Sequence, residues 1–174
     1  MRTIQATIYK CDELSDKAKE KAKSDQAALL GYSWSDDAFE SLKALAKHFG
    51  GKLKDWEIDY FGGCYSSCSF SMPEMSPKDI KAKLKELGTY NKRTGRGNGD
   101  CKLTGICFDE DAIDGFRLAF RAGERDLEKL KEAAFDSWLK AVQSDCEYQY
   151  GDEAFSENCE ANGYEFDEDG EFVR

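Results

Sequence analysis

The spacing of hydrophobic residues along the chain predicts six helices. Within each segment apolar residues recur every three or four positions, and a capping residue or a glycine marks most of the ends. Ser76 followed by Pro77, for example, joins a preferred N-cap to a residue suited to the first helical position. The predicted helices are bounded by residues 15 and 31, 35 and 50, 76 and 88, 110 and 123, 127 and 142, and 152 and 159.

Alternation of polar and apolar residues predicts short strands between these helices. In one of them Trp56, Ile58 and Tyr60 alternate with polar residues, and residues 61–63 then bend the chain with two glycines. Strands are expected at residues 3–9, 55–60, 64–71 and 103–108, with a strand, turn and strand at residues 164–173. Together with the helices they indicate an α+β fold, in which a small, mostly antiparallel sheet packs against several amphipathic helices.

The chain length favours a single domain spanning residues 1–174. At 174 residues, 40% of them hydrophobic and 13% aromatic, the chain can bury one sizeable core. No stretch approaches the roughly 20 apolar residues of a membrane span, and the first residues lack the apolar segment of a signal peptide. We therefore expect a cytoplasmic protein with no membrane partner, whose seven cysteines are free thiols.

Charge divides the chain into a neutral to basic part, residues 1–99, and an acidic part, residues 100–174. The first part holds 17 Lys/Arg and 14 Asp/Glu, and the second holds 8 and 21, which gives the whole chain a net charge of −10. Residues 144–174 contain eleven carboxylates and one base, Arg174. Such a field repels nucleic acid and steers basic surfaces toward it, so direct nucleic-acid binding is disfavoured as the main activity.

Aromatic residues are interleaved with these carboxylates, and a purely solubilising acidic tail would not need them. We therefore expect residues 144–174 to be folded and to present fixed carboxylates to a basic protein, although a solubilising role is the simpler alternative. The predicted partner-binding residues are Asp152, Glu153, Glu157, Glu160, Asp167, Glu168, Asp169 and Glu171, with Tyr148, Tyr150 and Tyr164 as aromatic anchors.

The segment at residues 90–100 contains three glycines and three bases, Lys92, Arg93 and Arg96. These bases are candidates for local contact with a nucleic-acid backbone, but a flexible connector is the favoured interpretation. A phosphate-binding loop needs its glycines between a strand and the start of a helix, whereas here a strand is expected to follow.

Cysteines raise the two remaining chemical possibilities, a zinc site and a reactive thiol. Cys64 and Cys68, with Cys101 and Cys107, lack the tight spacing of structural zinc sites, so we expect neither a metal nor a cofactor. A nucleophilic cysteine needs a nearby base, and His48 is the one histidine of the sequence. A thiol-dependent enzyme or redox protein using Cys64 and Cys68 is kept as an alternative, while no catalytic residue is assigned.

Both ends of the chain resemble those of small acidic bacteriophage and prophage accessory proteins. The resemblance lies in residues 3–9 and 13–22 at the start and in residues 162–170 at the end. Those proteins are mostly uncharacterised and are sometimes labelled antitoxin-like. The resemblance implies a phage-encoded, non-enzymatic inhibitor of a host defence system, of the anti-CRISPR or anti-restriction type, acting in an infected bacterium on a basic, nucleic-acid-handling complex. The alternative within this class is an antitoxin that neutralises a basic toxin.

Overall fold

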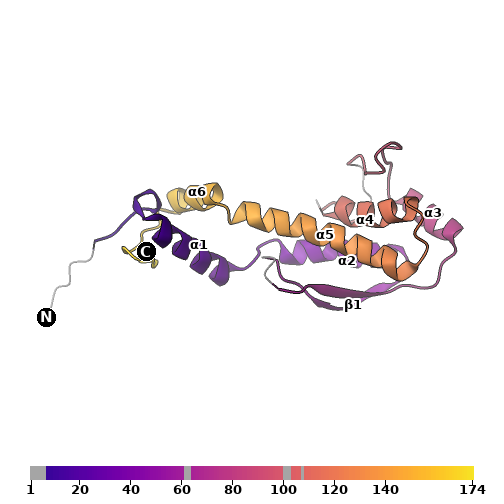
Figure 1. Cartoon of the computed structure of the whole chain (residues 1–174), viewed down its shortest axis with the longest axis horizontal. Coiled ribbons are helices and arrows are strands. Elements are labelled where there is room, and N and C mark those ends of the chain that lie inside the picture. Colours follow the sequence, from indigo (N-terminus) through magenta and orange to yellow (C-terminus); the bar gives the residue numbers. More distant parts are fainter. Residues whose placement is uncertain (1–6, 61–63, 100–102, 107) are drawn as a thin grey trace. The chain divides into compact units, whose positions relative to one another are not determined.

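The computed structural model describes residues 7–60, 64–99, 103–106 and 108–174. Among these residues it contains six α-helices, one short 3-10 helix and one two-stranded antiparallel sheet. The fold class is α+β, as predicted, but helices dominate it (Figure 1). In this described part no helix combines the length and the apolar composition that crossing a membrane would need.

The chain forms two compact units. Unit 1 joins the two ends, Met1–Ser33 and Asp145–Arg174, and unit 2 is the central segment Trp34–Ser144. The boundary between the basic and acidic parts of the sequence, at residues 99 and 100, therefore falls inside unit 2.

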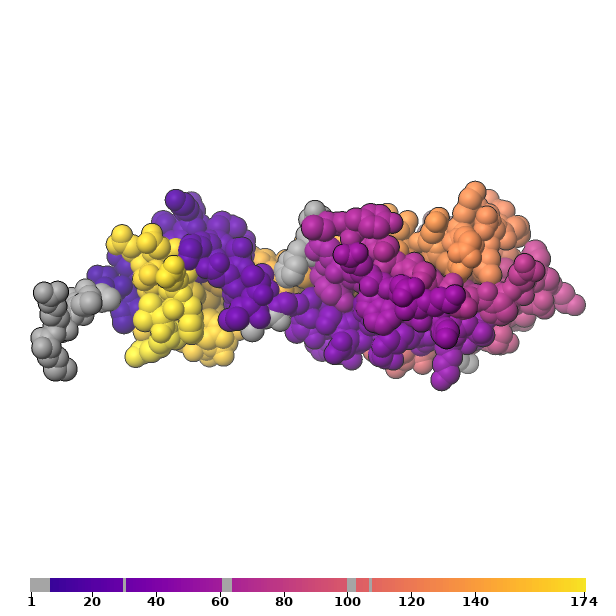
Figure 2. Space-filling view, turned by 90° about the horizontal axis from the view of Figure 1, so that it is seen from below, coloured from indigo at the N-terminus to yellow at the C-terminus, as the bar shows by residue number. Residues whose placement is uncertain are grey.

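Unit 1 contains the 3-10 helix η1 (Cys11–Glu13), helix α1 (Asp16–Leu30), the end of α5 (Leu127–Gln149) and α6 (Asp152–Asn162). Figure 2 shows the C-terminal segment, in yellow, lying against the indigo N-terminal part. Isolated β-bridges pair Phe166 with Tyr9 and with Phe172. The buried core of this unit consists of Cys11, Ala22, Phe155, Cys159 and Phe166, with Leu14 and Tyr164 packed against it.

A side-chain cap marks the start of α1 but not that of α6. The hydroxyl of Ser15 accepts a hydrogen bond from the backbone N–H of Ala18 at 3.2 Å, which confirms the predicted start of α1. The predicted cap of α6 is wrong, because Gly151 occupies the N-cap and Asp152 is the first helical residue. The Asp152 carboxylate instead accepts a hydrogen bond from Lys23 of α1 at 2.7 Å.

Unit 2 contains α2 (Ser35–His48), the strands β1 (Lys52–Glu57) and β2 (Ser67–Ser71), α3 (Pro77–Glu86), α4 (Asp109–Arg121) and most of α5. Helix α2 packs against both α4 and β1. Its Phe49 stacks on Phe116 of α4 with ring centroids 4.7 Å apart. On α5, Trp138 is fully buried and its indole N–H donates to the carbonyl of Ala38 at 2.9 Å. Helix α2 is thus the centre of this unit.

The hairpin differs from the prediction in its first strand. Strand β1 begins at Lys52 and ends at Glu57, whereas the sequence pattern predicted residues 55–60. The pairing register shifts between Leu53 and Trp56, where the alternation of polar and apolar residues also slips. A bulge carries the extra residue of the strand, so the pattern breaks while the pairing continues. The partner strand β2 falls within the predicted residues 64–71.

Two other predicted boundaries or elements are wrong. Helix α2 has Trp34 rather than Ser35 at its N-cap. No strand forms at residues 103–106 or at Phe108, because the carboxylate of Asp109 accepts hydrogen bonds from the backbone N–H groups of Thr104 and Gly105 at 2.8 and 2.9 Å. These contacts bend the chain into the start of α4 instead of leaving its amides for a sheet.

The expected strands at the two ends of the chain reduce to isolated bridges in the described residues. Residues 3–6 of the first predicted strand, the predicted bend at 61–63, and residues 100–102 and 107 lie outside the residues that the structure describes.

Candidate partner-binding surface

Residues 144–174 are folded, as the interleaved aromatic residues predicted. Phe155 and Cys159 bury one face of α6 in the core of unit 1. Beyond the helix, the backbone N–H of Tyr9 donates to the carbonyl of Phe166 at 2.8 Å, and that of Phe166 donates back at 2.9 Å. The carboxylates of this segment are therefore attached to ordered backbone.

Three glutamates form a line on the outer face of α6. Glu153, Glu157 and Glu160 are spaced by four and three residues, so they lie on one face of the helix, and all three are exposed. Among the described residues, the ion pairs of the C-terminal segment join Asp152 to Lys23, Glu171 to Lys21 and Glu165 to Arg174. The three glutamates, which we call the acidic stripe, take part in none of them.

A second group of carboxylates lies in the turn at residues 167–170, which we call the acidic turn. One carboxylate oxygen of Asp167 accepts the backbone N–H groups of Asp169 and Glu171 at 3.0 and 2.8 Å, so Asp167 shapes the turn. Gly170 has a φ of +83°, and a Cβ there would lie 2.1 Å from the carbonyl oxygen of Ala18. The turn thus sits directly on α1, with Glu168 and Asp169 exposed.

Two of the predicted partner-binding carboxylates tie the C-terminal segment to α1 instead. Lys23 bridges Asp152 and Glu20, each at 2.7 Å, and Lys21 lies 3.5 Å from Glu171. The hydrogen bond from Lys23 lowers the pKa of Asp152, and the same bond is the main cause that raises the pKa of Lys23. Asp152 and Glu171 therefore have partners within the chain.

The three predicted tyrosine anchors have different environments. Tyr148 is 76% exposed, so its ring is available to a partner. The hydroxyl of Tyr150 donates a hydrogen bond to the carbonyl of Gly31, and burial, followed by the nearby Cys146, raises the pKa of Tyr150. Tyr164 is half-buried and packs edge-to-face on Phe172, with ring centroids 5.2 Å apart. Tyr150 and Tyr164 already serve the fold of unit 1.

Sequence reasoning missed an apolar pocket beside the acidic turn. It has a volume of about 220 Å³ and lies between α1, α6 and the last residues of the chain. Its walls include Leu29 and Phe172, which are 84% and 62% exposed. The spacing of Ala22, Gln26 and Leu29 places all three on one face of α1, but the polar Gln26 interrupts the pattern that would have indicated a buried stripe.

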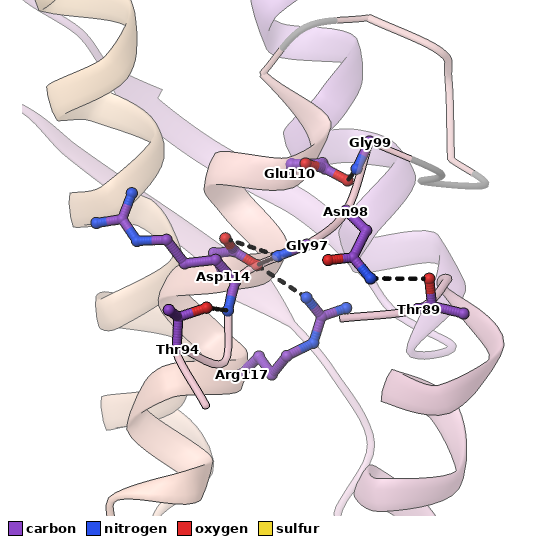
Figure 3. Close-up of polar contacts among 9 residues, drawn as sticks. Thr89, Thr94, Gly97, Asn98, Gly99, Glu110, Asp114 and Arg117 are labelled. Atoms are coloured by element: carbon purple, nitrogen blue, oxygen red, sulfur yellow. Dashed lines mark hydrogen bonds and ion pairs between the residues drawn. The ribbon is translucent and has the colours of Figure 1, made fainter. Parts of the chain in front are cut away.

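The basic segment at residues 90–99 is held against α4 and is not a free connector (Figure 3). The backbone N–H of Gly97 donates to both carboxylate oxygens of Asp114, at 2.9 and 3.1 Å, and that of Gly99 donates to Glu110 at 2.7 Å. Arg117 is buried and donates to Asp114 at 2.8 Å. Burial raises the pKa of Asp114, against the effects of the Gly97 hydrogen bond and the Arg117 charge.

These contacts limit what the segment can bind. Its backbone N–H groups at residues 93–97 and 99 all donate within the chain, to Asn91, Thr94, Asp114 or Glu110. The carbonyl of Lys92 accepts from Arg121 at 2.7 Å, while the side chains of Lys92, Arg93 and Arg96 are exposed. Those six amides are therefore not available as a cradle for a phosphate, and the three exposed basic side chains are the candidates for contact with a phosphate backbone.

The cysteine alternative gains no geometric support. Cys64 is exposed, whereas burial, followed by the nearby charge of Asp136, raises the pKa of Cys68 to about 12. A thiol with such a pKa is protonated at neutral pH and is a poor nucleophile. Cys101 and Cys107 lie outside the described residues. Within the described ranges no group of three or more His, Cys, Asp or Glu side chains is arranged to hold a metal ion.

Comparison of the chain with protein-family models, with curated proteins and with solved structures finds no match.

Proposed function

We propose that this chain is a binding protein that docks on a basic surface of another protein through the acidic stripe and the exposed carboxylates of the acidic turn. The observation that carries the proposal is the acidic stripe itself, in which three exposed glutamates are fixed on one face of a folded helix and form no ion pair with any other described residue. Fixed carboxylates can match the spacing of Lys and Arg on a partner without the loss of conformational entropy that a disordered acidic tail would incur on binding.

The helix dipole favours Glu153 in the first turn of α6, but the spacing of the stripe places like charges next to one another along the helix. Like charges four residues apart destabilise a helix by about 0.2–0.5 kcal/mol per pair. Glu160 also lies in the last turn of α6, where the helix dipole favours a cation and where no base is present. Solubility alone would be served as well by carboxylates elsewhere on the surface. The placement of these charges therefore favours a role outside the chain.

The partner class follows from this charge and from the phage resemblance of the two ends of the chain. A nucleic-acid-handling complex offers a basic channel or groove, and carboxylates held in a row can occupy it in place of phosphates. We propose such a complex of a bacterial defence system, of the CRISPR or restriction type, as the target. Inhibition then needs no catalytic residue in this chain.

A capture experiment from host lysate tests the proposal. The full chain is immobilised, and proteins retained at low salt and released at high salt are identified by mass spectrometry. We expect the triple variant Glu153→Gln, Glu157→Gln, Glu160→Gln to lose the partner. The matched control, Glu74→Gln, Glu132→Gln, Asp136→Asn, makes the same change in net charge at exposed positions of unit 2 and should keep it.

Three results would contradict the proposal or favour one of its alternatives. Equal capture by the stripe variant and the control would show that the stripe is not the docking surface. Recovery of a small basic toxin would favour the antitoxin alternative. Loss of biological effect in Cys64→Ser with Cys68→Ser, with capture of the partner intact, would favour the thiol-dependent alternative.

A further inference from the structure

The apolar pocket of unit 1 is open to solvent and is built from three separate segments. Phe155 of α6 and Phe166 form its buried floor, with ring centroids 6.2 Å apart, and Leu29 and Phe172 form exposed walls. Phe172 packs edge-to-face on Phe166 at 6.2 Å, which fixes that wall. The pocket therefore offers a partner a concave apolar surface with a buried floor and two exposed walls.

The size of the pocket indicates what kind of group fits it. Pockets for drug-sized ligands have volumes of roughly 300–1,000 Å³. At about 220 Å³ this pocket falls below that range. It suits one large apolar side chain, which is how a few residues anchor most protein interfaces.

Charge beside the pocket indicates what surrounds that side chain. Asp25 lines the pocket, and Glu168, Asp169 and Glu171 lie within two residues of the lining residue Gly170. Among the described contacts one cation serves this group, since Lys21 is shared between Asp25 at 3.1 Å and Glu171 at 3.5 Å. Four carboxylates against one ammonium give the chain beside the pocket a net negative charge.

We propose that this pocket receives one apolar side chain of the size of Leu, Met or Phe from a partner segment in which Lys or Arg flank that side chain. The inference rests on the proposed function, because it supplies the apolar anchor for the same acidic docking surface. A symmetric dimer formed through this pocket is disfavoured, because the carboxylates beside the pocket would face a copy of themselves.

The two parts of the surface should act on different steps of binding. Exposed carboxylates mainly speed association and set its salt dependence, whereas a buried apolar anchor mainly slows dissociation. Truncation of the side chains that form the pocket walls should therefore raise the dissociation rate and leave the slope of affinity against salt concentration unchanged. Loss of the acidic stripe should lower the association rate and flatten that slope.

The experiment uses the full chain and three fluorescein-labelled heptapeptides. The first has Phe flanked on each side by three Lys or Arg, the second has Ala in place of that Phe, and the third keeps Phe but replaces every base by Gln. Anisotropy gives the affinities and stopped flow gives the rates. We expect the first peptide to bind at least about tenfold more tightly than the Ala peptide, because burial of a Phe side chain alone is worth that factor. It should also bind more tightly than the Gln peptide, which lacks the bases that the carboxylates beside the pocket attract.

Substitutions in the pocket test whether the preference for the Phe peptide arises there. Leu29→Ala with Phe172→Ala should remove most of the preference for Phe over Ala and raise the dissociation rate. The control, Ile8→Ala with Val173→Ala, truncates two exposed apolar side chains of the same unit that do not line the pocket, and should change neither. Far-UV circular dichroism and thermal melts establish that both pairs stay folded.

The outcomes separate this inference from the proposed function. If the Phe and Ala peptides bind equally while the stripe variant loses both, the pocket has no anchoring role and the acidic docking surface stands. If the uncharged Phe peptide binds as well as the basic one, the requirement for flanking bases is overturned. Failure of all three peptides to bind, or a dimer in sedimentation that the pocket variant dissolves, overturns the assigned occupant.

Discussion

The two units differ in their net charge and in whether their charged residues are buried and paired or exposed. Residues 34–144 of unit 2 carry 18 Lys/Arg and 19 Asp/Glu, a net charge of −1, while the two segments of unit 1 carry 7 and 16, a net charge of −9. The buried charged residues of the described chain, Asp109, Arg117 and Lys131, all belong to unit 2 and have hydrogen-bond partners there. In unit 1 the stripe carboxylates are exposed and have no ion pair among the described residues.

This difference separates charges that serve the fold from charges that face outward. A buried charge without a partner costs several kcal/mol, so those of unit 2 are constrained by the fold. An exposed charge costs little, so stability alone does not determine where the excess carboxylates of unit 1 lie. On this view unit 2 is mainly a scaffold and unit 1 carries the interaction.

The largest effect should come from the centre of unit 2. Trp138→Ala removes a fully buried ring that packs edge-to-face on Phe39 at 5.8 Å, and we expect a loss of about 3–5 kcal/mol in the free energy of unfolding. All three tryptophans belong to unit 2, so urea denaturation followed by the fluorescence of Trp34 and Trp56 measures this unit alone.

Circular dichroism in the same titration reports both units. A second transition, at a urea concentration unchanged from that of the wild type, would show that unit 1 unfolds independently. A single transition that moves as a whole would instead make the two units one cooperative structure and would weaken the division between scaffold and interaction surface. Trp56→Ala is the control, since that side chain is 51% exposed and should cost much less.

A smaller but more selective effect is expected from Gly170→Ala in unit 1. Its positive φ alone costs a side chain about 1–3 kcal/mol, and the added Cβ would collide with the Ala18 carbonyl. Gly163→Ala is a matched control, because Gly163 also has a positive φ of +64° but nothing lies within 4 Å of its Cβ position.

The excess destabilisation of Gly170→Ala over Gly163→Ala measures the seating of the acidic turn on α1. Hydrogen exchange at the Glu171 amide, which donates to Asp167 at 2.8 Å, should accelerate only in the first variant. Equal effects of the two substitutions would mean that the turn gains nothing from its close approach to α1.

Acidification should change the stability of the two units in opposite directions, through one carboxylate in each unit. Burial, followed by the nearby Asp114, raises the pKa of Asp111 above its ordinary 3.8, so its ionisation opposes folding and the penalty disappears as pH falls through the raised pKa. The Lys23 hydrogen bond lowers the pKa of Asp152, so its stabilising contribution is present above pH 3.8 and is lost as pH falls through the lowered pKa.

Asp111→Asn should therefore be more stable than the wild type at pH 7, and Asp152→Asn less stable. Both differences should shrink on acidification, which thermal melts at a series of pH values between 7 and 3 will measure. A difference that keeps its size at pH 3 would have to arise from packing and not from charge.

Helices were predictable from sequence where their signals are local. The Ser76 cap, the Pro77 that follows it and the apolar spacing of Ile80 and Leu84 all lie within one segment, and α3 has the predicted limits. The strand expected at residues 103–108 does not form in the described part of that segment, because the Asp109 carboxylate, which lies just past it, accepts the amides of Thr104 and Gly105. Alternation of residue types gives no sign of that competition.

The acidic surface was predictable in composition and not in detail. Eleven carboxylates among six aromatic residues indicated a folded acidic segment. Which carboxylates are paired depends on α1, more than a hundred residues away in sequence, and so does the pocket between Leu29 and Phe172. The contacts of Gly97 and Gly99 with α4 are of the same kind, since they join residues 17 and 11 positions apart.

The smallest expected change in stability most directly tests the contrast between charges that serve the fold and charges that serve an interaction. Glu157 is four residues from Glu153 and three from Glu160, so Glu157→Gln relieves two repulsive pairs, and we expect a gain of about 0.2–0.5 kcal/mol per pair in the stability of α6. Partner affinity should fall in the same variant. Urea denaturation followed by circular dichroism at low salt measures the first change, and salt should reduce it. Asp136→Asn, at an exposed position on α5 with Glu132 four residues before it and Lys140 four residues after it, removes one repulsive and one attractive pair and should not gain stability. A stability gain without loss of binding would leave the stripe as an unexplained cost to the fold, whereas both changes together mean that unit 1 gives up stability for its interaction.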